Sequence, residues 1–250
     1  MIDINFESKL KEISDLIKIW EKRYLTPIGK ITIVKTFLMS KLNHLFQTLP
    51  TPGQDWLKQL EGMFFKFIWS NMPDKINRHV ATLDKKQGGL QMPDLKLFIK
   101  SLKATWIGRY FRRGISPWVE LLDILTSNNM EKILSLGPDY ICSLKNKIKN
   151  RFWIDVLDAT HDILQHQRFS NQQGILTTPI WYNSEISSET LFLPEWYHKG
   201  ICSVSDILDN AGEVASLSYL QNKYNIKDNN FLNHLRVNVG TLKFLKTKNY

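Results

Sequence analysis

A short acidic series is the part of this sequence whose spacing most resembles a metal-binding or catalytic cluster. Asp155, Asp158 and Asp162 follow one another at intervals of three and four residues, and His161 adjoins the last of them. On a helix, this spacing places the three carboxylates along one face. Such a face could be a metal site, but an ordinary solvated surface is the commoner explanation, and we expect no metal site.

Other residue patterns that perform catalysis are missing from the sequence. Polymerases and nucleases hold two metal ions with paired carboxylates, but the chain has neither adjacent aspartates nor an Asp-x-Asp motif. The histidines do not form a His-Glu-x-x-His pattern, and there is no Gly-x-Ser-x-Gly elbow. Gly88-Gly89 is not followed by the Gly-Lys-Ser/Thr of a phosphate-binding loop. We therefore expect no enzyme activity and no cofactor.

Cysteine usage and hydropathy favour a protein with reduced thiols and no membrane partner. Cys142 and Cys202 are the two cysteines, too few for a disulfide scaffold or a Cys-rich zinc site. No apolar run approaches the ~20 residues that a membrane helix needs. The N-terminal MIDINFESKL is acidic and amphipathic, unlike a signal peptide. We expect an intracellular protein of the nucleus or cytoplasm.

Positive charge is concentrated in the first half of the chain. Residues 1–113 contain 20 Lys and Arg and 10 Asp and Glu, a net charge of +10, whereas residues 114–250 contain 13 and 14, a net charge of −1. This asymmetry points to a polyanionic partner, most often nucleic acid. The alternative is a basic face that serves only solubility.

We predict that eight basic residues contact a phosphate backbone. At ~100° per residue, two of these lysines fall on the same side of a helix predicted over residues 27–49. Three others form a stripe at spacings of four and three on a helix predicted over residues 93–113, and two flank the Gly88-Gly89 turn. The predicted nucleic-acid-binding residues are Lys30, Lys41, Lys85, Lys86, Lys96, Lys100, Lys103 and Arg109. The alternative for each is simple solvation.

The elements that must position these side chains are helices, since apolar residues recur every three or four positions along most of the chain. The fold is predicted to be all-α, with at most one short β-hairpin near residues 80–92 built around Gly88-Gly89. Residues 168–200 lack this period and are expected to form an extended crossover. Helices are predicted over residues 6–24, 27–49, 53–70, 93–113, 116–126, 129–136, 143–166, 203–210, 214–224 and 228–237.

Two sequence signals indicate where helices start, and one unusually apolar segment indicates burial. Thr26-Pro27 and Thr51-Pro52 each combine a residue suited to the N-cap with a proline suited to the first helical position. The run MFFKFIWS, residues 63–70, is too apolar for a surface helix. It must be buried on most sides or pack against a partner.

Several ordered motifs together resemble a known family. They are IWEKRYLTPIGKITIVKTFLMSKLNHLF, then FFKFIWS, then GGLQMPDLKLFIKSLKATWI, all within the first 107 residues. This series resembles the region that follows the reverse-transcriptase palm in the second open reading frame protein of LINE-type (non-LTR) retrotransposons. The later PIWYNSEI and residues 200–226 resemble the tail of that region. The matching residues are Trp20, Arg23, Leu25, Thr26, Gly29, Lys30, Phe65, Phe67, Trp69, Gly88, Gly89, Leu90, Pro93, Asp94, Leu95 and Trp106.

The resemblance implies a thumb-like helical region over residues 1–113 and a second helical region over residues 114–250. In that family the thumb cradles the RNA–DNA hybrid that leaves the polymerase site. The palm with its catalytic aspartates, the endonuclease domain and the Cys/His-rich knuckle have no counterpart in this sequence. The chain thus resembles a detached C-terminal piece, from either a degenerate element copy or a partial gene model.

Three functions follow as alternatives. The first is a noncatalytic nucleic-acid-binding protein whose partners are RNA and DNA, as a hybrid or a template. The second is a helical interaction module that packs on a reverse-transcriptase palm, or a remnant with no function. The third, an active reverse transcriptase, is disfavoured because the metal-binding carboxylate pair is missing.

Overall fold

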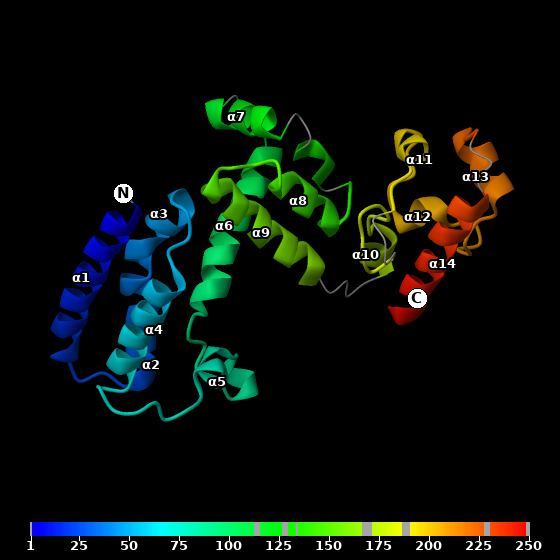
Figure 1. Ribbon diagram of the computed structural model, residues 1–250. Helices are drawn as coiled ribbons and strands as arrows, with labels where there is room; N and C mark the ends of the chain where they lie inside the picture. Colours follow the sequence, from blue (N-terminus) through cyan, green and yellow to red (C-terminus); the bar gives the residue numbers. More distant parts are fainter. Residues whose placement is uncertain are drawn as a thin grey trace. The chain divides into compact units, whose positions relative to one another are not determined.

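The computed structural model describes residues 2–112, 116–126, 130–133, 135–166, 172–186, 191–227 and 231–248 (Figure 1). The predicted all-α fold is confirmed, because these ranges are mainly helical. Their β-type pairings are two isolated bridges, Pro179 with Ser203 and Leu208 with Val214. The chain forms two compact units: unit 1 is Met1–Gly108 with Asn150–Ala159, and unit 2 is Arg109–Lys149 with Thr160–Tyr250.

Unit 1 contains the helices that carry most of the predicted binding residues. Two of its helices, α6 and α9, continue into unit 2 beyond Gly108 and Ala159. Its elements are α1 (Ile2–Glu21), α2 (Pro27–Ile33), a π-helical turn η1 (Val34–Leu38), α3 (Ser40–Thr48), α4 (Gln54–Ile68), α5 (Arg78–Thr82), a 3-10 turn η2 (Lys85–Gln87), α6 (Leu95–Phe111) and the first part of α9 (Arg151–His166).

The helix predicted over residues 27–49 forms as three consecutive helical segments. Thr26 caps its start, since the Gly29 amide donates to Thr26 Oγ1 at 3.2 Å, and Pro27 occupies the first turn. The middle is the π-helical η1, where the Met39 amide donates to the Val34 carbonyl at 2.9 Å. The predicted apolar stripe still reaches the core, because Val34, Leu38 and Leu42 are buried.

An aromatic cluster joins α1, α3 and α4. The ring centroids of Phe6 and Trp56 lie 5.0 Å apart, and Phe46 lies 6.1 Å from Phe6 and 6.2 Å from Trp56. The two pairs with Trp56 are edge-to-face and the Phe6–Phe46 pair is stacked, and such pairs add to the stabilisation from apolar burial. Packing against α1 and α3 sets the position of α4, whose N-terminus borders the candidate site.

Residues 150–159 belong to the second half of the sequence but pack in unit 1. The sequence predicts one helix over residues 143–166, but the helix ends with α8 (Pro138–Lys145) and a second helix begins at α9. Asn150 starts α9, since its Oδ1 accepts from the Phe152 amide at 3.0 Å and the Trp153 amide at 3.3 Å. Both rings then meet Trp106 of α6, at centroid distances of 5.5 and 5.9 Å.

The hairpin considered near residues 80–92 does not form. Asn77 Oδ1 instead accepts from the His79 amide at 2.8 Å and starts α5. Three amides hold the returning chain: Leu90 and Met92 donate to the Ala81 carbonyl at 3.2 and 2.9 Å, and Gln91 donates to the Leu83 carbonyl at 3.0 Å. These bonds join a helix to a turn, so no strand ladder arises.

The double glycine has a structural reason within this turn. Gly88 has a φ of +80°, a backbone conformation that side chains disfavour. A Cβ on Gly89 would lie 1.9 Å from the carbonyl oxygen of Leu83. Both glycines are therefore required by the path of the backbone, and the two lysines before them lie on the turn that this path forms.

Unit 2 is built around two buried tryptophans. Trp181 and Trp196 are fully buried with ring centroids 6.4 Å apart, and Trp181 Nε1 donates to the Ile201 carbonyl at 2.6 Å. The crossover predicted over residues 168–200 therefore contributes core aromatics, and its described part includes two short helices. The remaining elements are α7 (Pro117–Leu125), a 3-10 turn η3 (Met130–Ile133), α8, α10 (Gln172–Leu176), α11 (Pro194–His198), α12 (Val204–Ile207), α13 (Leu217–Tyr224) and α14 (Phe231–Thr247).

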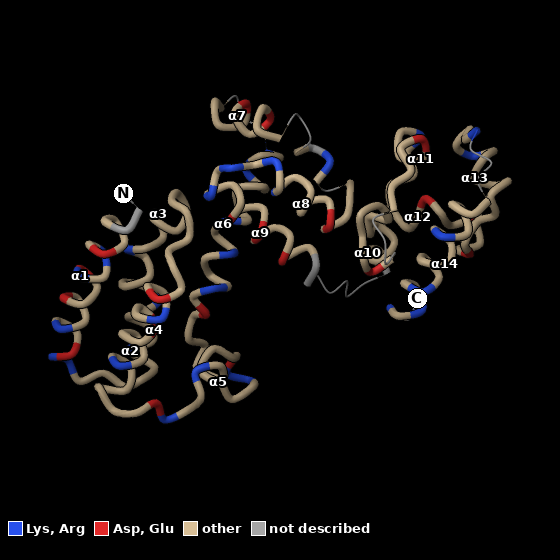
Figure 2. Tube along the Cα trace, viewed as in Figure 1, with Lys and Arg blue, Asp and Glu red and all other residues tan. Residues whose placement is uncertain are grey.

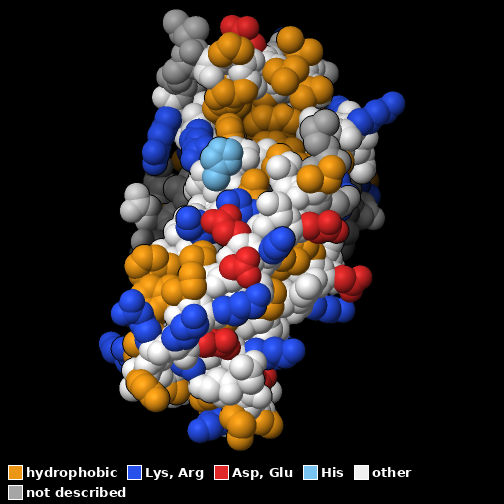
Figure 3. All heavy atoms as spheres, turned by 90° about the vertical axis from the view of Figure 1, so that its left-hand side faces the viewer, with side chains coloured by type: hydrophobic (Ala, Val, Ile, Leu, Met, Phe, Trp, Pro, Cys, Tyr) orange, Lys and Arg blue, Asp and Glu red, His pale blue; other side chains and the backbone are white. Residues whose placement is uncertain are grey.

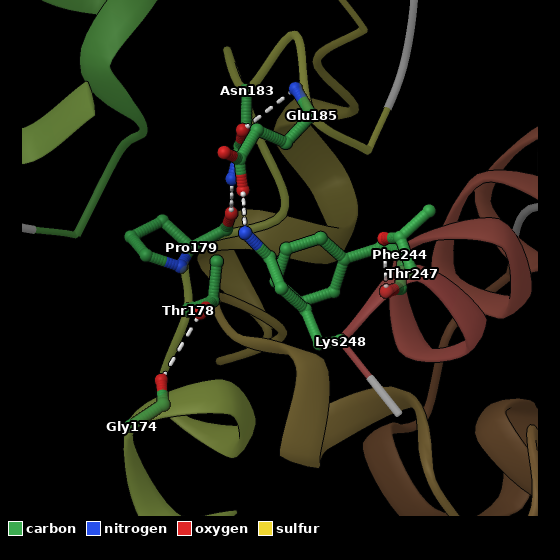
Figure 4. Close-up of polar contacts among 8 residues, drawn as sticks. All are labelled: Gly174, Thr178, Pro179, Asn183, Glu185, Phe244, Thr247 and Lys248. Carbon is green, nitrogen blue, oxygen red and sulfur yellow. Dashed lines mark hydrogen bonds and ion pairs between the residues drawn. The ribbon is translucent and has the colours of Figure 1, made fainter. Parts of the chain in front are cut away.

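The end of α14 is anchored to residues 179–186 (Figure 4). Lys248 Nζ lies 3.0 Å from Glu185 Oε2, and Asn183 Nδ2 donates to the Pro179 carbonyl at 2.7 Å. Closer to the helix centre, a Cβ on Gly240 would lie 2.2 Å from the Ile186 carbonyl oxygen. Glycine thus lets α14 approach this backbone directly. The helix ends at Thr247, ten residues beyond the end predicted at residue 237.

Candidate nucleic-acid interface

Net charge is shared more evenly between the compact units than between the halves of the sequence. Unit 1 contains 18 Lys and Arg and 12 Asp and Glu, a net charge of +6, and unit 2 contains 15 and 12, a net charge of +3. The difference in net charge is smaller between the units than between the halves because unit 1 includes Asp155 and Asp158, while unit 2 includes Arg109, Arg112 and Arg113. The position of particular lysines, rather than total charge, must therefore define any interface.

The basic stripe of α6 is the best-defined part of the candidate surface (Figure 2). Asp94 starts this helix, accepting from the Lys96 amide at 2.8 Å and the Leu97 amide at 3.0 Å. The helix itself contains no acidic residue. Lys96 and Lys100 are exposed, whereas Lys103, one turn further, is buried. Two of the three predicted stripe residues thus lie at the surface.

Lys103 is enclosed by residues from several parts of unit 1. Its Nζ donates to the Leu49 carbonyl and lies 4.4 Å from the centroid of the Phe152 ring, and only 1% of the residue is exposed. Burial lowers the pKa of this amine to about 8, opposed by the nearby Asp155 carboxylate, which raises it. Lys103 therefore lies below the surface and does not contact an extended backbone.

Lys85 and Lys86 are exposed on the turn that precedes Gly88-Gly89. They form the 3-10 turn η2, and the Gly88 amide closes it by donating to the Lys85 carbonyl at 3.1 Å. The turn leads within a few residues into α6. The two lysines therefore belong to the same chain segment as the exposed stripe of that helix.

Lys30 has an internal role. It is 6% exposed, and its Nζ donates to the Phe67 carbonyl at 3.0 Å and to Ser70 Oγ at 2.6 Å. The amine also lies 5.3 Å from the centroid of the Phe67 ring. Because Lys30 bonds one of the last carbonyls of α4 and the Ser70 hydroxyl just after it, it connects α2 to α4 and is not part of an exposed surface.

Lys41 is exposed but paired. Its Nζ lies 3.4 Å from Glu12 Oε1, and Lys9 Nζ lies 2.5 Å from the other oxygen of that carboxylate. The hydrogen bond from Lys9, followed by that from Lys41, lowers the pKa of Glu12. Figure 3 shows the side of the molecule that lies at the left in Figure 1, where basic and acidic side chains are interspersed. Pairing weakens the case for a phosphate-binding role of Lys41.

Arg109 is exposed and falls in unit 2. At ~100° per residue it lies far around α6 from Lys96, Lys100 and Lys103. It is therefore not part of the basic stripe, although it lies on the same helix.

A cavity of about 450 Å³ lies within unit 1 and is lined by parts of α6, α9 and the segment that leads into α4. It brings the predicted stripe together with a residue that sequence analysis missed, Arg151. Its charged lining residues are Lys96, Lys100, Lys103, Arg151, Asp155 and Asp158. Arg151 could not be found from charge spacing on one helix, because it reaches the site only through the return of residues 150–159.

The acidic series does not form a metal site in the part of the chain that the structure describes, where no group of three potential ligands gathers. Asp155 Oδ2 instead accepts from the Thr51 amide at 2.6 Å. His161 Nδ1 lies 3.8 Å from Asp162 Oδ1. Asp155 and Asp158 therefore contribute negative charge to the cavity rather than a cation cage.

The aromatic run of α4 is covered within unit 1. Phe64, Phe65, Phe67, Ile68 and Trp69 are all buried in its core. This removes the basis for treating the run as a free partner-binding face, since the same chain supplies the surfaces that cover it.

No protein-family model matches the chain. The resemblance to the LINE-type region thus stays a prediction that rests on its motifs. No helix in the described ranges is long and apolar enough to cross a bilayer.

Proposed function

We propose that unit 1 binds nucleic acid through the phosphate backbone, with an RNA–DNA hybrid as its ligand and without catalysing a reaction. The observation that carries this proposal is the exposure of Lys85, Lys86, Lys96 and Lys100, which lie on the turn η2 and on the helix that follows it, α6, which has no acidic residues. Lysines gain affinity by releasing counterions from phosphates and need not read the bases. A hybrid suits them because A-form helices are recognised largely through shape and backbone.

The resemblance to the thumb of LINE-type reverse transcriptases supports the same ligand. In that family the equivalent region follows the polymerase palm, and the motif that contains Gly88 and Gly89 lies in the turn that presents Lys85 and Lys86. We therefore propose that the chain derives from such an element and does not itself catalyse a reaction. The palm-binding alternative is not carried further, since the aromatic run that suggested it is buried.

Fluorescence anisotropy with a short RNA–DNA hybrid, measured across a salt series, tests the proposal. We expect tight binding whose logarithm falls linearly with the logarithm of salt concentration. Replacing Lys85, Lys86, Lys96 and Lys100 by Gln should weaken binding and reduce the salt slope by roughly one for each lysine that contacts a phosphate.

A matched variant separates a located interface from total charge. Lys9, Lys11, Lys18 and Lys22 lie on or just after α1 in the same unit, so their replacement by Gln removes the same charge elsewhere. The α1 variant should keep most of the wild-type slope. Equal losses in the two variants would mean that net charge alone causes binding, and the proposal would be withdrawn.

A further inference from the structure

The cavity of unit 1 contains more cationic than anionic side chains. Four basic residues and two carboxylates line it, which leaves a net charge of +2 when all are ionised. The Asp155 carboxylate already accepts from the Thr51 amide at 2.6 Å. Within the described residues, neither Lys96 nor Arg151 has an ion-pair partner within 4.0 Å. The cavity therefore offers two uncompensated cations to an anion.

The N-terminus of α4 adds to this preference. Gly53 and Gln54 line the cavity, and Gly53 is the N-cap residue, which supplies no side-chain hydrogen bond to the helix. The first backbone amides of a helix, together with its dipole, favour negative charge. This end of α4 and the cations of α6 and α9 thus favour the same class of ligand.

Part of the lining is apolar. Pro52, Leu57, Ile99 and Ala159 supply it. A cavity of about 450 Å³ lies in the range of small-molecule sites, which combine apolar walls with a few polar groups. An inorganic anion would leave the apolar wall unused, and a continuous duplex is too wide to enter. A single nucleotide has both the charge and the flat apolar surface that this lining complements.

We propose that the cavity binds the phosphomonoester of one nucleotide, either free or at the end of a nucleic-acid strand. Lys96 and Arg151 contact the phosphate, and the base lies against the apolar side formed by Pro52, Leu57 and Ile99. For the strand end, this inference rests on the proposed function, because Lys96 belongs to both surfaces. For a free nucleotide it stands independently.

Anisotropy of the full chain with labelled single strands tests this assignment. Three strands of one sequence are compared, carrying a 5′-phosphate, a 3′-phosphate or hydroxyl groups at both ends, and a nucleoside monophosphate is added as competitor. We expect a terminal phosphate to tighten binding roughly tenfold, as a charge-assisted contact in a partly closed site implies. The nucleoside monophosphate should remove this gain.

Two charge-matched variants locate the effect. The pair Lys96→Gln and Arg151→Gln removes two exposed cavity cations, and the pair Lys85→Gln and Lys86→Gln removes two exposed cations elsewhere in unit 1. The first pair should abolish the gain from the terminal phosphate, and the second should preserve it. Binding of the nucleoside monophosphate without any gain from a strand end would assign the cavity to free nucleotides.

The inference fails if neither a terminal phosphate nor a nucleoside monophosphate binds, or if both variant pairs reduce the phosphate gain equally. The hydroxyl-ended strand keeps this result separate from the proposed function. Its salt-dependent binding reports the backbone surface alone. Loss of that binding with retention of nucleotide binding would reject the proposed function and leave the cavity assignment intact.

Discussion

Two helices of similar length, α4 in unit 1 and α14 in unit 2, use their apolar residues in opposite ways. The aromatic residues of α4 are covered by the core of unit 1. On α14, one face packs in the core of unit 2 while Leu232, Leu235, Val239 and Leu242 on another are 41–66% exposed. Apolar content alone therefore does not identify a binding face. What identifies it is whether the rest of the chain covers the residues.

A matched pair of truncations gives the largest expected contrast. Phe64→Ala removes a fully buried ring from α4 and should lower the free energy of unfolding by about 3–5 kcal/mol. Leu235→Ala removes a partly exposed side chain from α14 and should change it by about 0.5 kcal/mol or less. Denaturant unfolding checks both values. Similar losses would mean that the α14 face is covered in solution.

The buried amine of Lys103 should give unit 1 an unusual dependence on pH. Its pKa is about 8 in the folded chain, below the ordinary value of 10.5, so the unfolded chain holds more protons between these values. Stability should therefore rise with pH across that window, by up to about 3 kcal/mol.

Lys103→Met should remove this rise. Unfolding measured at pH 7 and near pH 10 in both proteins isolates the effect, because other titrations cancel in the difference. The exposed Lys96→Met serves as the control and should behave as wild type. An unchanged pH dependence in Lys103→Met would show that the amine is hydrated.

Two helical glycines provide the smallest contrast between the units. Gly240→Ala places a Cβ against the Ile186 backbone and should cost about 1–3 kcal/mol. Gly62→Ala in α4 meets nothing within 4 Å and should stabilise by up to about 1 kcal/mol, since alanine favours the helix. Thermal unfolding with the same sign for both variants would contradict this packing.

Local patterns predicted much of the secondary structure, because a helix needs only its own apolar period and caps. Thr26 and Pro27 start a helix as predicted. The same prediction for Thr51 and Pro52 was wrong, because Gly53 is the N-cap of α4. The burial of Lys30 and Lys103 could not be predicted, since each is covered by residues distant in sequence. Periodicity placed Lys103 in a stripe with Lys96 and Lys100, but nothing local indicated that Phe152 would cover it.

The same limit applies to the candidate site. Lys96 and Lys100 were found from spacing, whereas Arg151 was missed because its helix was expected to belong to the second half of the chain. The break at Asn150 was the available signal, since asparagine favours an N-cap. Which unit the restarted helix joins depends on Trp106 meeting Phe152 and Trp153, a pairing that no local pattern specifies.

The discontinuity of unit 1 has a consequence for its biosynthesis. The ribosome releases residues 1–108 well before residues 150–159, which complete this unit. Until α9 emerges, Trp106 lacks its two aromatic neighbours and the Lys103 amine lacks the Phe152 ring beside it. The nascent chain must therefore hold an unfinished core while the intervening segment is translated, and translation pauses within residues 109–149 would prolong its exposure to chaperones and proteases.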